Sequence, residues 1–273
     1  MTDTPGSHRP RRRFGQNFLH DPGVIARIVS AIDPRPGQHL VEIGPGHGAI
    51  TEGLLRAAGS LDVIELDRDL VGPLAERLGG LGALRVHGAD ALHFDLCGLR
   101  SAPPAEQLRV VGNLPYNIST PLLFRFLEQA DCIVDLHLML QKEVVDRIVA
   151  APGSKTYGRL SVMVQSRCRC ERLLTIGPGA FRPAPKVDSA LVRLVPRHPP
   201  QPPIDDPALH AHIVATAFAK RRKTLRNALA GLVDADLLAA AEIDPAARAE
   251  TLCIADYARL ANRAAACNDA KKP

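Results

Sequence analysis

Residues 39–48 read His39-Leu40-Val41-Glu42-Ile43-Gly44-Pro45-Gly46-His47-Gly48, a short apolar run followed by three glycines in five residues. The apolar run predicts a buried strand, and residues 50–58 beyond the glycines predict a helix. Because glycine has no side chain, such a turn lets a ligand approach the backbone at the edge of a parallel sheet. The stretch therefore predicts an α/β fold with a nucleotide-binding turn. Gly44-x-Gly46-x-x-Ala49 also fits the dinucleotide fingerprint, so the turn alone does not choose the cofactor.

Two further predicted strands end beside an acidic residue. Residues 61–64 run into Glu65, about twenty positions after Gly44, where a carboxylate can hold a ribose diol. Residues 83–87 are followed by Asp90, which is placed to accept a hydrogen bond from the exocyclic amine of an adenine. The nearby Asp67 is better explained as a helix N-cap.

The next predicted strand covers Val110-Val111-Gly112 and ends in Asn113-Leu114-Pro115-Tyr116. Proline has no N–H group and stops the ladder, so Asn113 and Tyr116 should project from the carboxyl edge of the sheet. An amide and free backbone carbonyls can accept hydrogen bonds from an exocyclic amine, while a Tyr ring can stack on the base. The motif predicts a site for an aminated nucleobase. The alternative is an ordinary turn after a strand.

Composition excludes several classes of protein. The chain has 273 residues, 46% of them hydrophobic, and neither a membrane span nor a signal peptide is recognisable. We expect a soluble, cytoplasmic protein that does not associate with membranes. The six cysteines are scattered without a C-x-x-C pair, so we expect free thiols in a reducing compartment and no metal site.

Positive charge is unevenly distributed along a chain of formal net charge +5. Three clusters predict a surface that binds a polyanion, although a solvated face would explain any one of them. The clusters are Arg9 with Arg11, Arg12 and Arg13; Arg167 with Arg169 and Arg172; and Lys220, Arg221, Arg222 and Lys223 with Arg226.

The chain divides at a Pro-rich stretch, residues 196–203. Residues 1–13 predict a disordered basic arm, residues 14–197 an α/β domain, and residues 198–273 a small all-helical domain. A mitochondrial transit peptide is the rival interpretation of the arm, but Asp3 and the lack of an apolar face argue against it. The predicted helices of the C-terminal domain cover residues 210–232, 235–241, 245–250 and 254–266.

With these elements in order, the chain resembles the class I S-adenosylmethionine-dependent methyltransferases. More narrowly, it resembles the family of small-subunit ribosomal RNA adenine dimethyltransferases from Phe14 to Asn227. The motifs that carry the resemblance are F-G-Q-N-F-L from Phe14, V-E-I-G-P-G-H-G-A-I-T from Val41, E-L-D from Glu65, G-A-D-A-L from Gly88, N-L-P-Y-N-I-S from Asn113, F-R-P-A-P-K-V-D-S from Phe181 and A-F-A-K-R-R-K-T-L-R-N from Ala217. The resemblance implies a Rossmann-like, mostly parallel sheet with one late antiparallel strand.

The resemblance also implies residue roles. Tyr116 and Phe181 would sandwich a flipped adenine, although an ordinary core aromatic is the alternative for Phe181. Lys220, Arg221, Arg222, Lys223 and Arg226 would contact RNA phosphates. The residues implied to bind S-adenosylmethionine are Asn17, Leu19, Gly44, Gly46, Glu65, Asp90 and Asn113, and those at the target base are Asn113, Leu114, Pro115, Tyr116 and Phe181.

The implied reaction is dimethylation of N6 on two adjacent adenines in a hairpin near the 3′ end of small-subunit rRNA. The implied partner is an assembling ribosomal subunit, and we expect a monomer. Hydrogen bonds from N6–H to Asn113 and a nearby backbone carbonyl would aim the lone pair at the methyl group, so no general base is required. Rival functions are a large-subunit rRNA methyltransferase of the antibiotic-resistance type, a non-catalytic assembly or transcription factor, and an NAD-dependent dehydrogenase. Ala184, where relatives often have proline, and His47 are minor departures.

Overall fold

The computed structural model describes residues 17–100, 107–199 and 201–269, so the predicted basic arm lies outside the described residues. The chain forms two compact units. The first unit consists of the chain up to Val145 together with Glu171–Val195. The second consists of Asp146–Cys170 together with the chain from Pro196 onward. The second unit is therefore built from two separate segments. Residues 146–170, assigned from the sequence to the α/β domain, cluster with the C-terminal helices.

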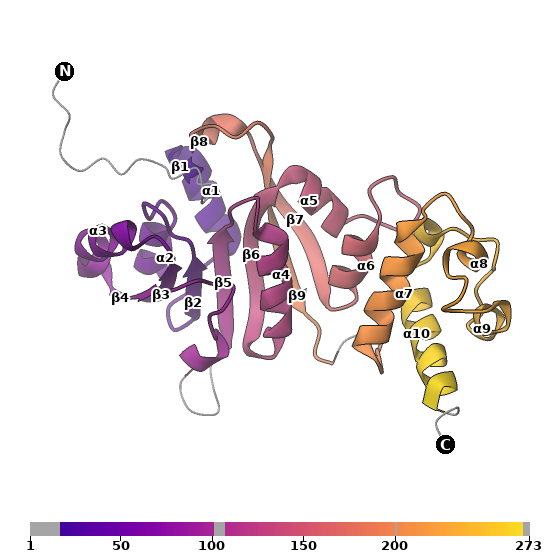
Figure 1. Cartoon of the computed structure of the whole chain (residues 1–273). Coiled ribbons are helices and arrows are strands. Elements are labelled where there is room, and N and C mark those ends of the chain that lie inside the picture. Colours follow the sequence, from indigo (N-terminus) through magenta and orange to yellow (C-terminus); the bar gives the residue numbers. More distant parts are fainter. Residues whose placement is uncertain (1–16, 101–106, 200, 270–273) are drawn as a thin grey trace. The chain divides into compact units, whose positions relative to one another are not determined.

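The first unit is organised around a seven-stranded sheet of order β4-β3-β2-β5-β6-β9-β7 (Figure 1). The pairs from β4 to β6 are parallel, and β9 is antiparallel to β6, which confirms the predicted mostly parallel sheet. The strands are β2 (His39–Ile43), β3 (Ser60–Glu65), β4 (Ala83–Gly88), β5 (Leu108–Asn113), β6 (Ile133–Gln141), β7 (Cys168–Ile176) and β9 (Ser189–Pro196).

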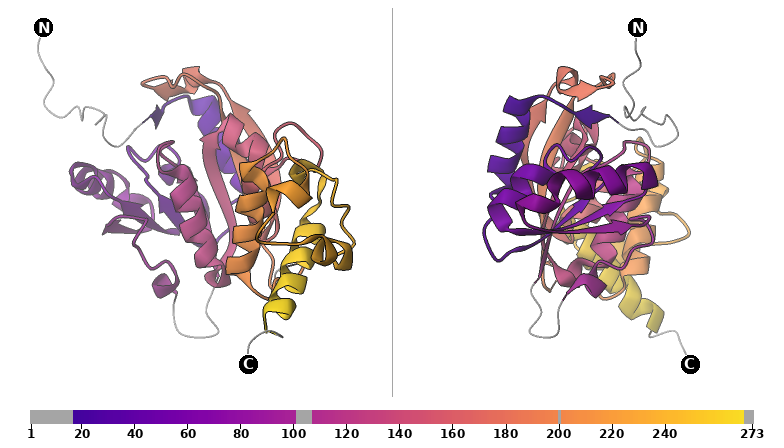
Figure 2. Two further views of the ribbon diagram at one scale, coloured as in Figure 1. Left: turned by 45° about the vertical axis from the view of Figure 1, so that its right-hand side comes forward. Right: turned by 90° about the vertical axis from the view of Figure 1, so that its left-hand side faces the viewer.

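Helices lie on both faces of this sheet (Figure 2). Side chains from α1, α2 and α3 share one apolar core with alternate residues of β2, β3 and β5, such as Leu40, Val63 and Val111. The buried face of α4, which includes Leu122 and Phe126, lies on the opposite side of the sheet. The helices are α1 (Pro22–Ile32), α2 (Thr51–Ala58), α3 (Arg68–Leu78), α4 (Ser119–Glu128) and α5 (Lys142–Ile148).

Local capping signals are confirmed. Asp21 caps α1 by accepting a hydrogen bond from the N–H of Val24 at 3.0 Å, and Pro22 occupies the first turn. Asp67 caps α3, where its side chain accepts from the N–H of Asp69. Asp67 is therefore an N-cap, as its position predicted.

A small two-stranded sheet joins the beginning of the described chain to a much later segment. β1 (Phe18–Leu19) pairs antiparallel with β8 (Phe181–Arg182), so that Leu19 lies opposite Phe181. The N–H of His20 also donates to the carbonyl oxygen of Ala180 at 2.9 Å. Backbone hydrogen bonds therefore hold the first motif beside the F-R-P-A-P-K-V-D-S segment.

The second unit is helical, with α6 (Arg159–Gln165), α7 (Pro207–Ala219), α8 (Leu225–Ala228), α9 (Ala235–Ala240) and α10 (Ile254–Asp269). The rings of Tyr157, Phe218 and Tyr257 pack together in its interior. The single helix predicted over residues 210–232 is wrong, because the chain turns at residues 220–223 and Thr224 then forms a β-bridge with Arg248. The helix predicted over 245–250 is also wrong, and a 3-10 turn covers Ala249–Thr251 instead.

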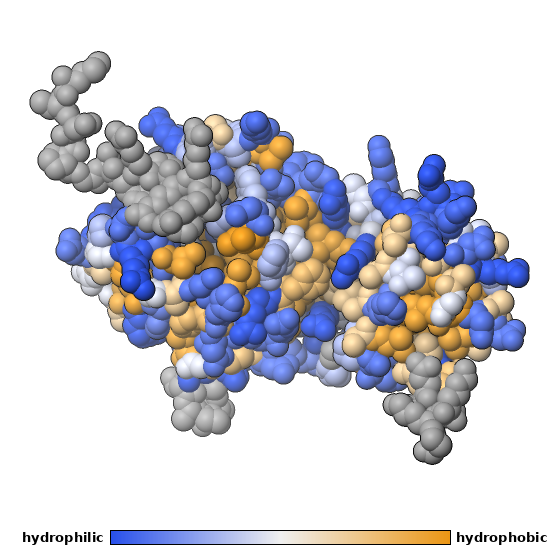
Figure 3. All heavy atoms as spheres, in the orientation of Figure 1, coloured by the Kyte–Doolittle hydropathy of each residue, from blue (hydrophilic) through white to orange (hydrophobic). Residues whose placement is uncertain are grey.

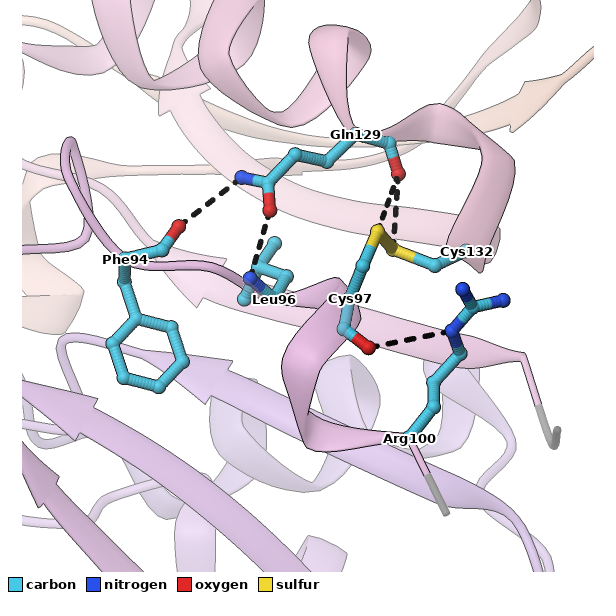
Figure 4. Close-up of a disulfide and its surroundings, with 6 residues drawn as sticks. All are labelled: Phe94, Leu96, Cys97, Arg100, Gln129 and Cys132. Atoms are coloured by element: carbon cyan, nitrogen blue, oxygen red, sulfur yellow. Dashed lines mark hydrogen bonds between the residues drawn. A yellow bond between two sulfur atoms is a disulfide. The ribbon is translucent and has the colours of Figure 1, made fainter. Parts of the chain in front are cut away.

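Two of the six cysteines form a disulfide, which corrects the expectation of six free thiols. Cys97 and Cys132 have Cα atoms 5.5 Å apart (Figure 4). Gln129 connects the same two segments, because its amide accepts from the N–H of Leu96 at 2.8 Å and donates to the carbonyl of Phe94 at 3.2 Å. The sequence did not indicate this pairing because the two cysteines are 35 positions apart and have no spacing that is diagnostic of a disulfide.

A buried carboxylate connects three neighbouring strands at one end of the sheet. Asp62 on β3 is 1% exposed, and its oxygens lie 2.8 Å from ring nitrogens of His39 on β2 and His87 on β4. The guanidinium of Arg85 donates two further hydrogen bonds, of 2.8 and 2.6 Å. Burial alone would raise the pKa of Asp62, but the bonds with His39, Arg85 and His87 outweigh it and hold the pKa well below its usual range.

We predict that Asp62→Asn lowers the free energy of unfolding at pH 7 by roughly 1.5–3 kcal/mol, the range for hydrogen bonds to a charged group. Because the folded-state pKa is depressed, this contribution is complete above the unfolded pKa of about 4 and is lost as the pH falls below it. Urea unfolding at pH 7 and pH 3 measures the difference. Asp33→Asn, at an exposed carboxylate, is the control. An equal deficit at both pH values would contradict the prediction.

Candidate functional site

A cavity of about 260 Å³ lies at the carboxyl ends of β2, β3 and β5 in the first unit. Each of these strands ends beside a residue that the sequence singled out, and the sheet brings those residues to one edge. The predicted residues that line the cavity are Asn17, Leu19, Gly44, Gly46, Glu65, Asp90, Asn113, Leu114, Pro115 and Tyr116. No group of side chains suited to a metal ion occurs in the described part of the chain, and none of its helices is long and apolar enough to cross a membrane.

The glycine turn has the geometry that its sequence predicted. Gly44 and Gly46 have φ of +63° and +57°, in the left-handed region that side chains disfavour. A Cβ atom on Gly46 would lie 3.0 Å from the ring of Phe18. The ring of Phe18 also contacts that of His47, with centroids 4.2 Å apart. The turn is therefore packed closely under β1, and its glycines leave room on the cavity side.

Glu65 serves the turn as well as the cavity. One carboxylate oxygen accepts from the N–H of Asp67 at 2.8 Å, and the other accepts from the N–H of Gly46 at 3.1 Å. The residue is 5% exposed, and burial raises the pKa of Glu65, although the two N–H groups oppose the increase. Each oxygen retains acceptor capacity for a ligand hydroxyl. Glu65 is therefore a brace for the glycine turn, not a solvent-facing carboxylate.

Asp90 also lines the cavity, in the turn that follows β4. Its Oδ1 accepts from the N–H of Leu92 at 2.9 Å, and its Oδ2 lies 3.3 Å from Nδ1 of His93. The side chain is 38% exposed, so the Asp90 carboxylate is accessible to a ligand as well as fixed by its own turn.

Asn113 is held in one orientation. Its Nδ2 donates to the backbone carbonyl of Asn17 at 3.1 Å. A carbonyl can only accept, so this contact assigns the nitrogen and leaves Oδ1 as the acceptor on the other side of the amide. The same contact links the first motif to the end of β5. Asn113 lines the cavity with its amide held in one orientation, and its role toward a target amine stays a prediction.

The three residues after Asn113 are positioned by separate contacts. The N–H of Leu114 donates to the carbonyl of Met139 at 3.2 Å, and the carbonyl of Pro115 accepts from Ile118 at 3.1 Å. Within the described residues, the carbonyl oxygen of Leu114 has no hydrogen-bond partner, which leaves it as a second acceptor. Tyr116 is half-buried and lines the cavity.

Phe181 does not line the cavity. It is 2% exposed and belongs to the apolar core shared with Leu19. This burial favours the alternative of an ordinary core aromatic, and the stacking role of Phe181 stays a prediction. The sequence left both alternatives open because a loop between two predicted strands gives no information on which way its single ring points.

Sequence reasoning missed Glu42, which lines the cavity one residue before the end of β2. It is 1% exposed, and its Oε2 has no partner among the described residues. Burial raises the pKa of Glu42 to about 8; the hydroxyl of Thr51 opposes this and the charge of Glu65 adds to it. A polar residue inside an otherwise apolar strand was the available signal. The unpartnered, buried oxygen fits a ligand that supplies a hydrogen-bond partner.

The basic cluster predicted to bind RNA belongs to the second unit, in the turn after α7 and the start of α8. Lys220, Arg221, Arg222, Lys223 and Arg226 are all exposed, and hydrophilic side chains project from the end of this unit at which α7 ends (Figure 3). The guanidinium of Arg221 donates to the carbonyls of Lys155 and Tyr157, each at 3.3 Å. Arg221 therefore anchors a neighbouring loop, and this distinguishes it from the other four cations.

We predict that Glu42→Gln changes how stability depends on pH. The folded protein keeps the Glu42 proton up to about pH 8, whereas the unfolded chain releases it near pH 4.3. Folding therefore takes up a proton in this window, and the wild type loses stability as the pH rises through it, whereas glutamine cannot ionise. Urea unfolding at pH 5, 6.5 and 8 should show that the free energy of unfolding of the variant, relative to that of the wild type, increases with pH. Glu52→Gln, at an exposed glutamate, should show no such increase. An unfolding free energy that changes with pH equally in Glu42→Gln and the wild type would contradict the buried-acid assignment.

Comparisons with known proteins agree with this geometry. Residues 7–266 match the family model described as ribosomal RNA adenine dimethylase. The chain is 56% identical over 258 residues to ribosomal RNA small subunit methyltransferase A of Pseudomonas aeruginosa, which covers 94% of this chain and 96% of the relative. It is 55% identical over 256 residues to the protein of the same name from Methylococcus capsulatus, and the match covers 94% of this chain and 98% of that relative.

Among solved structures, the 23S rRNA methyltransferase ErmE is similar with a TM-score of 0.70 and 27% identity, covering 91% of this chain and all of that one. A dimethyladenosine transferase from Plasmodium falciparum has a TM-score of 0.76 at 24% identity, with 89% and 95% covered, and this likeness supports the fold. Together with the family match over nearly the whole chain, these similarities show that the chain belongs to the ribosomal RNA adenine dimethylase family.

Proposed function

We propose that the protein transfers methyl groups from S-adenosylmethionine to N6 of two adjacent adenines in a hairpin near the 3′ end of small-subunit rRNA. We further propose that it acts as a cytoplasmic monomer on an assembling ribosomal subunit. The observation that carries the proposal is the oriented amide of Asn113, which lines the cavity at the carboxyl edge of the sheet. The names of the relatives at 56% and 55% identity support the small-subunit substrate.

The residues of the cavity fit S-adenosylmethionine. Glu65 would hold the ribose hydroxyls, Asp90 the adenine amine, and the unpartnered Oε2 of Glu42 would form a hydrogen bond with the methionine moiety. Gly44 and Gly46 leave the backbone open on the cavity side. When bound, this cofactor supplies an electrophilic methyl group on a sulfonium that leaves as a neutral thioether.

The remaining task for the protein is to orient a weak nucleophile. The lone pair of adenine N6 is delocalised into the ring, so the amine attacks well only when its nitrogen becomes pyramidal. Oδ1 of Asn113 and the free carbonyl of Leu114 would each accept a hydrogen bond from the amine and favour that shape. Tyr116 would stack on the extruded base. After the first transfer the amine loses a proton to solvent and keeps one N6–H, so during the second transfer the pocket must tolerate a methyl group where a hydrogen bond was.

Three rival functions are separated by simple measurements. The similarity in fold to ErmE favours a large-subunit substrate. However, the chain is only 27% identical to ErmE, compared with 56% to the small-subunit relative from Pseudomonas aeruginosa. Methylation of isolated large subunits instead of small subunits would establish that rival. A non-catalytic factor would transfer no methyl to either subunit. Calorimetric titration with NAD in place of S-adenosylmethionine tests the dehydrogenase.

We predict that Asn113→Ala slows methyl transfer on the order of a hundredfold, because the lost acceptor acts mainly in the transition state. The assay is single-turnover transfer of labelled methyl to unmethylated small subunits, scored for N6-methyl and N6,N6-dimethyl adenosine. Asn262→Ala, at an asparagine of the second unit that bonds Asp205 and Pro203, should retain the wild-type rate. Cofactor binding by Asn113→Ala, measured by calorimetry, should persist at reduced affinity. Near-wild-type dimethylation by Asn113→Ala would refute the proposed role.

We also predict that replacing Lys220, Arg222 and Lys223 with alanine weakens RNA binding and reduces its salt dependence. Each phosphate that the protein no longer neutralises lowers the slope by about 0.7 on single strands and about 0.9 on a duplex. Binding to the small subunit is measured over a series of salt concentrations. A control with the same change in charge replaces the exposed residues Arg27, Arg68 and Arg263. An unchanged slope in the first variant would mean that the cluster is a solvated face.

A further inference from the structure

The ring of Tyr116 is tied to a residue that does not line the cavity. The phenol oxygen lies 2.6 Å from the hydroxyl oxygen of Ser189. Ser189 is the first residue of β9, is 1% exposed, and lies opposite Gln141 of β6 in the antiparallel register. It also ends the F-R-P-A-P-K-V-D-S segment, a motif to which the cavity itself assigns no role.

Tyr116 is fixed at both of its ends. The hydroxyl of Ser119 donates to the backbone carbonyl of Tyr116 at 3.1 Å, and Ser189 holds the far end of the side chain. Between these contacts the residue is only half-buried, so packing does not fully enclose the side chain. Burial raises the pKa of Tyr116, opposed by the Ser189 bond, so the phenol stays protonated and both hydroxyl groups remain able to donate or accept.

Ser189 is suited to act as a fixed point. Its strand is paired with β6, and the preceding carbonyl, that of Asp188, accepts from the N–H of Lys142 at 2.9 Å. A hydroxyl group on a paired strand varies little in position, whereas a half-exposed ring can turn about two side-chain torsions. The bond therefore transfers the rigidity of the sheet to the ring.

We propose that Ser189 is a positioning residue, which sets the plane of the Tyr116 ring so that an incoming adenine stacks with N6 in line for transfer. The inference rests on the proposed function. Stacking tolerates any base but requires nearly parallel planes, and a small misplacement of a reacting group lowers the rate steeply. Ser189 thus connects the late motif to the chemistry at Asn113 without contacting the substrate.

The first test is a double-mutant cycle on the rate of transfer. Ser189→Ala and Tyr116→Phe each remove the same hydrogen bond and keep the rest of the side chain. Each should lower the single-turnover rate about tenfold, the effect of one neutral hydrogen bond left without its partner. The double variant should be no slower than either single one, because both changes break one interaction. Independent effects that multiply to about a hundredfold would overturn the proposal.

The second test observes the ring without reference to activity. The chain has three tyrosines, and Tyr157 and Tyr257 are fully buried, so ring-labelled tyrosine gives NMR signals in which these two serve as internal references. Tyr116→Phe assigns the remaining signal. In Ser189→Ala this signal should shift and broaden or sharpen as the ring gains freedom, while the reference signals stay unchanged. An unaltered Tyr116 signal would overturn the proposal even if the rate falls.

A matched control separates positioning from folding. Ser166→Ala removes the hydroxyl of another serine that is 1% exposed, whose Oγ donates to the carbonyl of Met163 at 3.2 Å in the second unit. It should leave the transfer rate and the Tyr116 signal unchanged. Cofactor affinity should be unaltered in Ser189→Ala, and a loss there would indicate a general structural role and overturn the proposal. If the wild type transfers no methyl to the small subunit, the proposed function itself fails, and the NMR comparison still decides whether Ser189 holds the ring.

Discussion

The site depends on the parallel pairing of β2 with β5. In this register Ile43 lies opposite Gly112, so the glycine turn and Asn113 leave the sheet side by side. A Cβ atom at position 112 would lie 3.2 Å from the carbonyl oxygen of Ile43 and 2.8 Å from the side chain of Leu114. Glycine at 112 therefore permits the close approach that brings the cofactor turn and the target motif into one cavity.

Several residues of the cavity serve the backbone and the ligand with different atoms. Glu65 accepts from Gly46 and Asp67, and Asn113 donates to Asn17, yet each retains acceptor capacity on the cavity side. The protein without a ligand therefore already fixes the orientation of these groups. Less order has to be imposed when a ligand binds, which favours affinity and rate alike.

The sequence predicted those features that depend on short segments. Apolar runs that end in polar residues identified the strands, and the rule that ligands bind at the carboxyl edge of a parallel sheet placed Glu65, Asp90 and Asn113 together. Features that depend on distant partners were not predictable in this way. Phe181 is buried because β8 pairs with β1, and the Cys97–Cys132 disulfide joins two separate turns. The turn at 220–223 is followed by a β-bridge between Thr224 and Arg248, and no local sequence pattern predicts this long-range pairing.

The strand pair β1 and β8 has a consequence for synthesis. Leu19 leaves the ribosome early, but its partner Phe181 and the Ser189 that holds Tyr116 follow only after nearly all of the sheet has been made. Chains are synthesised at about 5–20 residues per second, and domains generally fold as units. A nascent chain therefore carries Tyr116 without its Ser189 partner for several seconds, and the contact between the two hydroxyl groups forms only after β9 emerges from the exit tunnel.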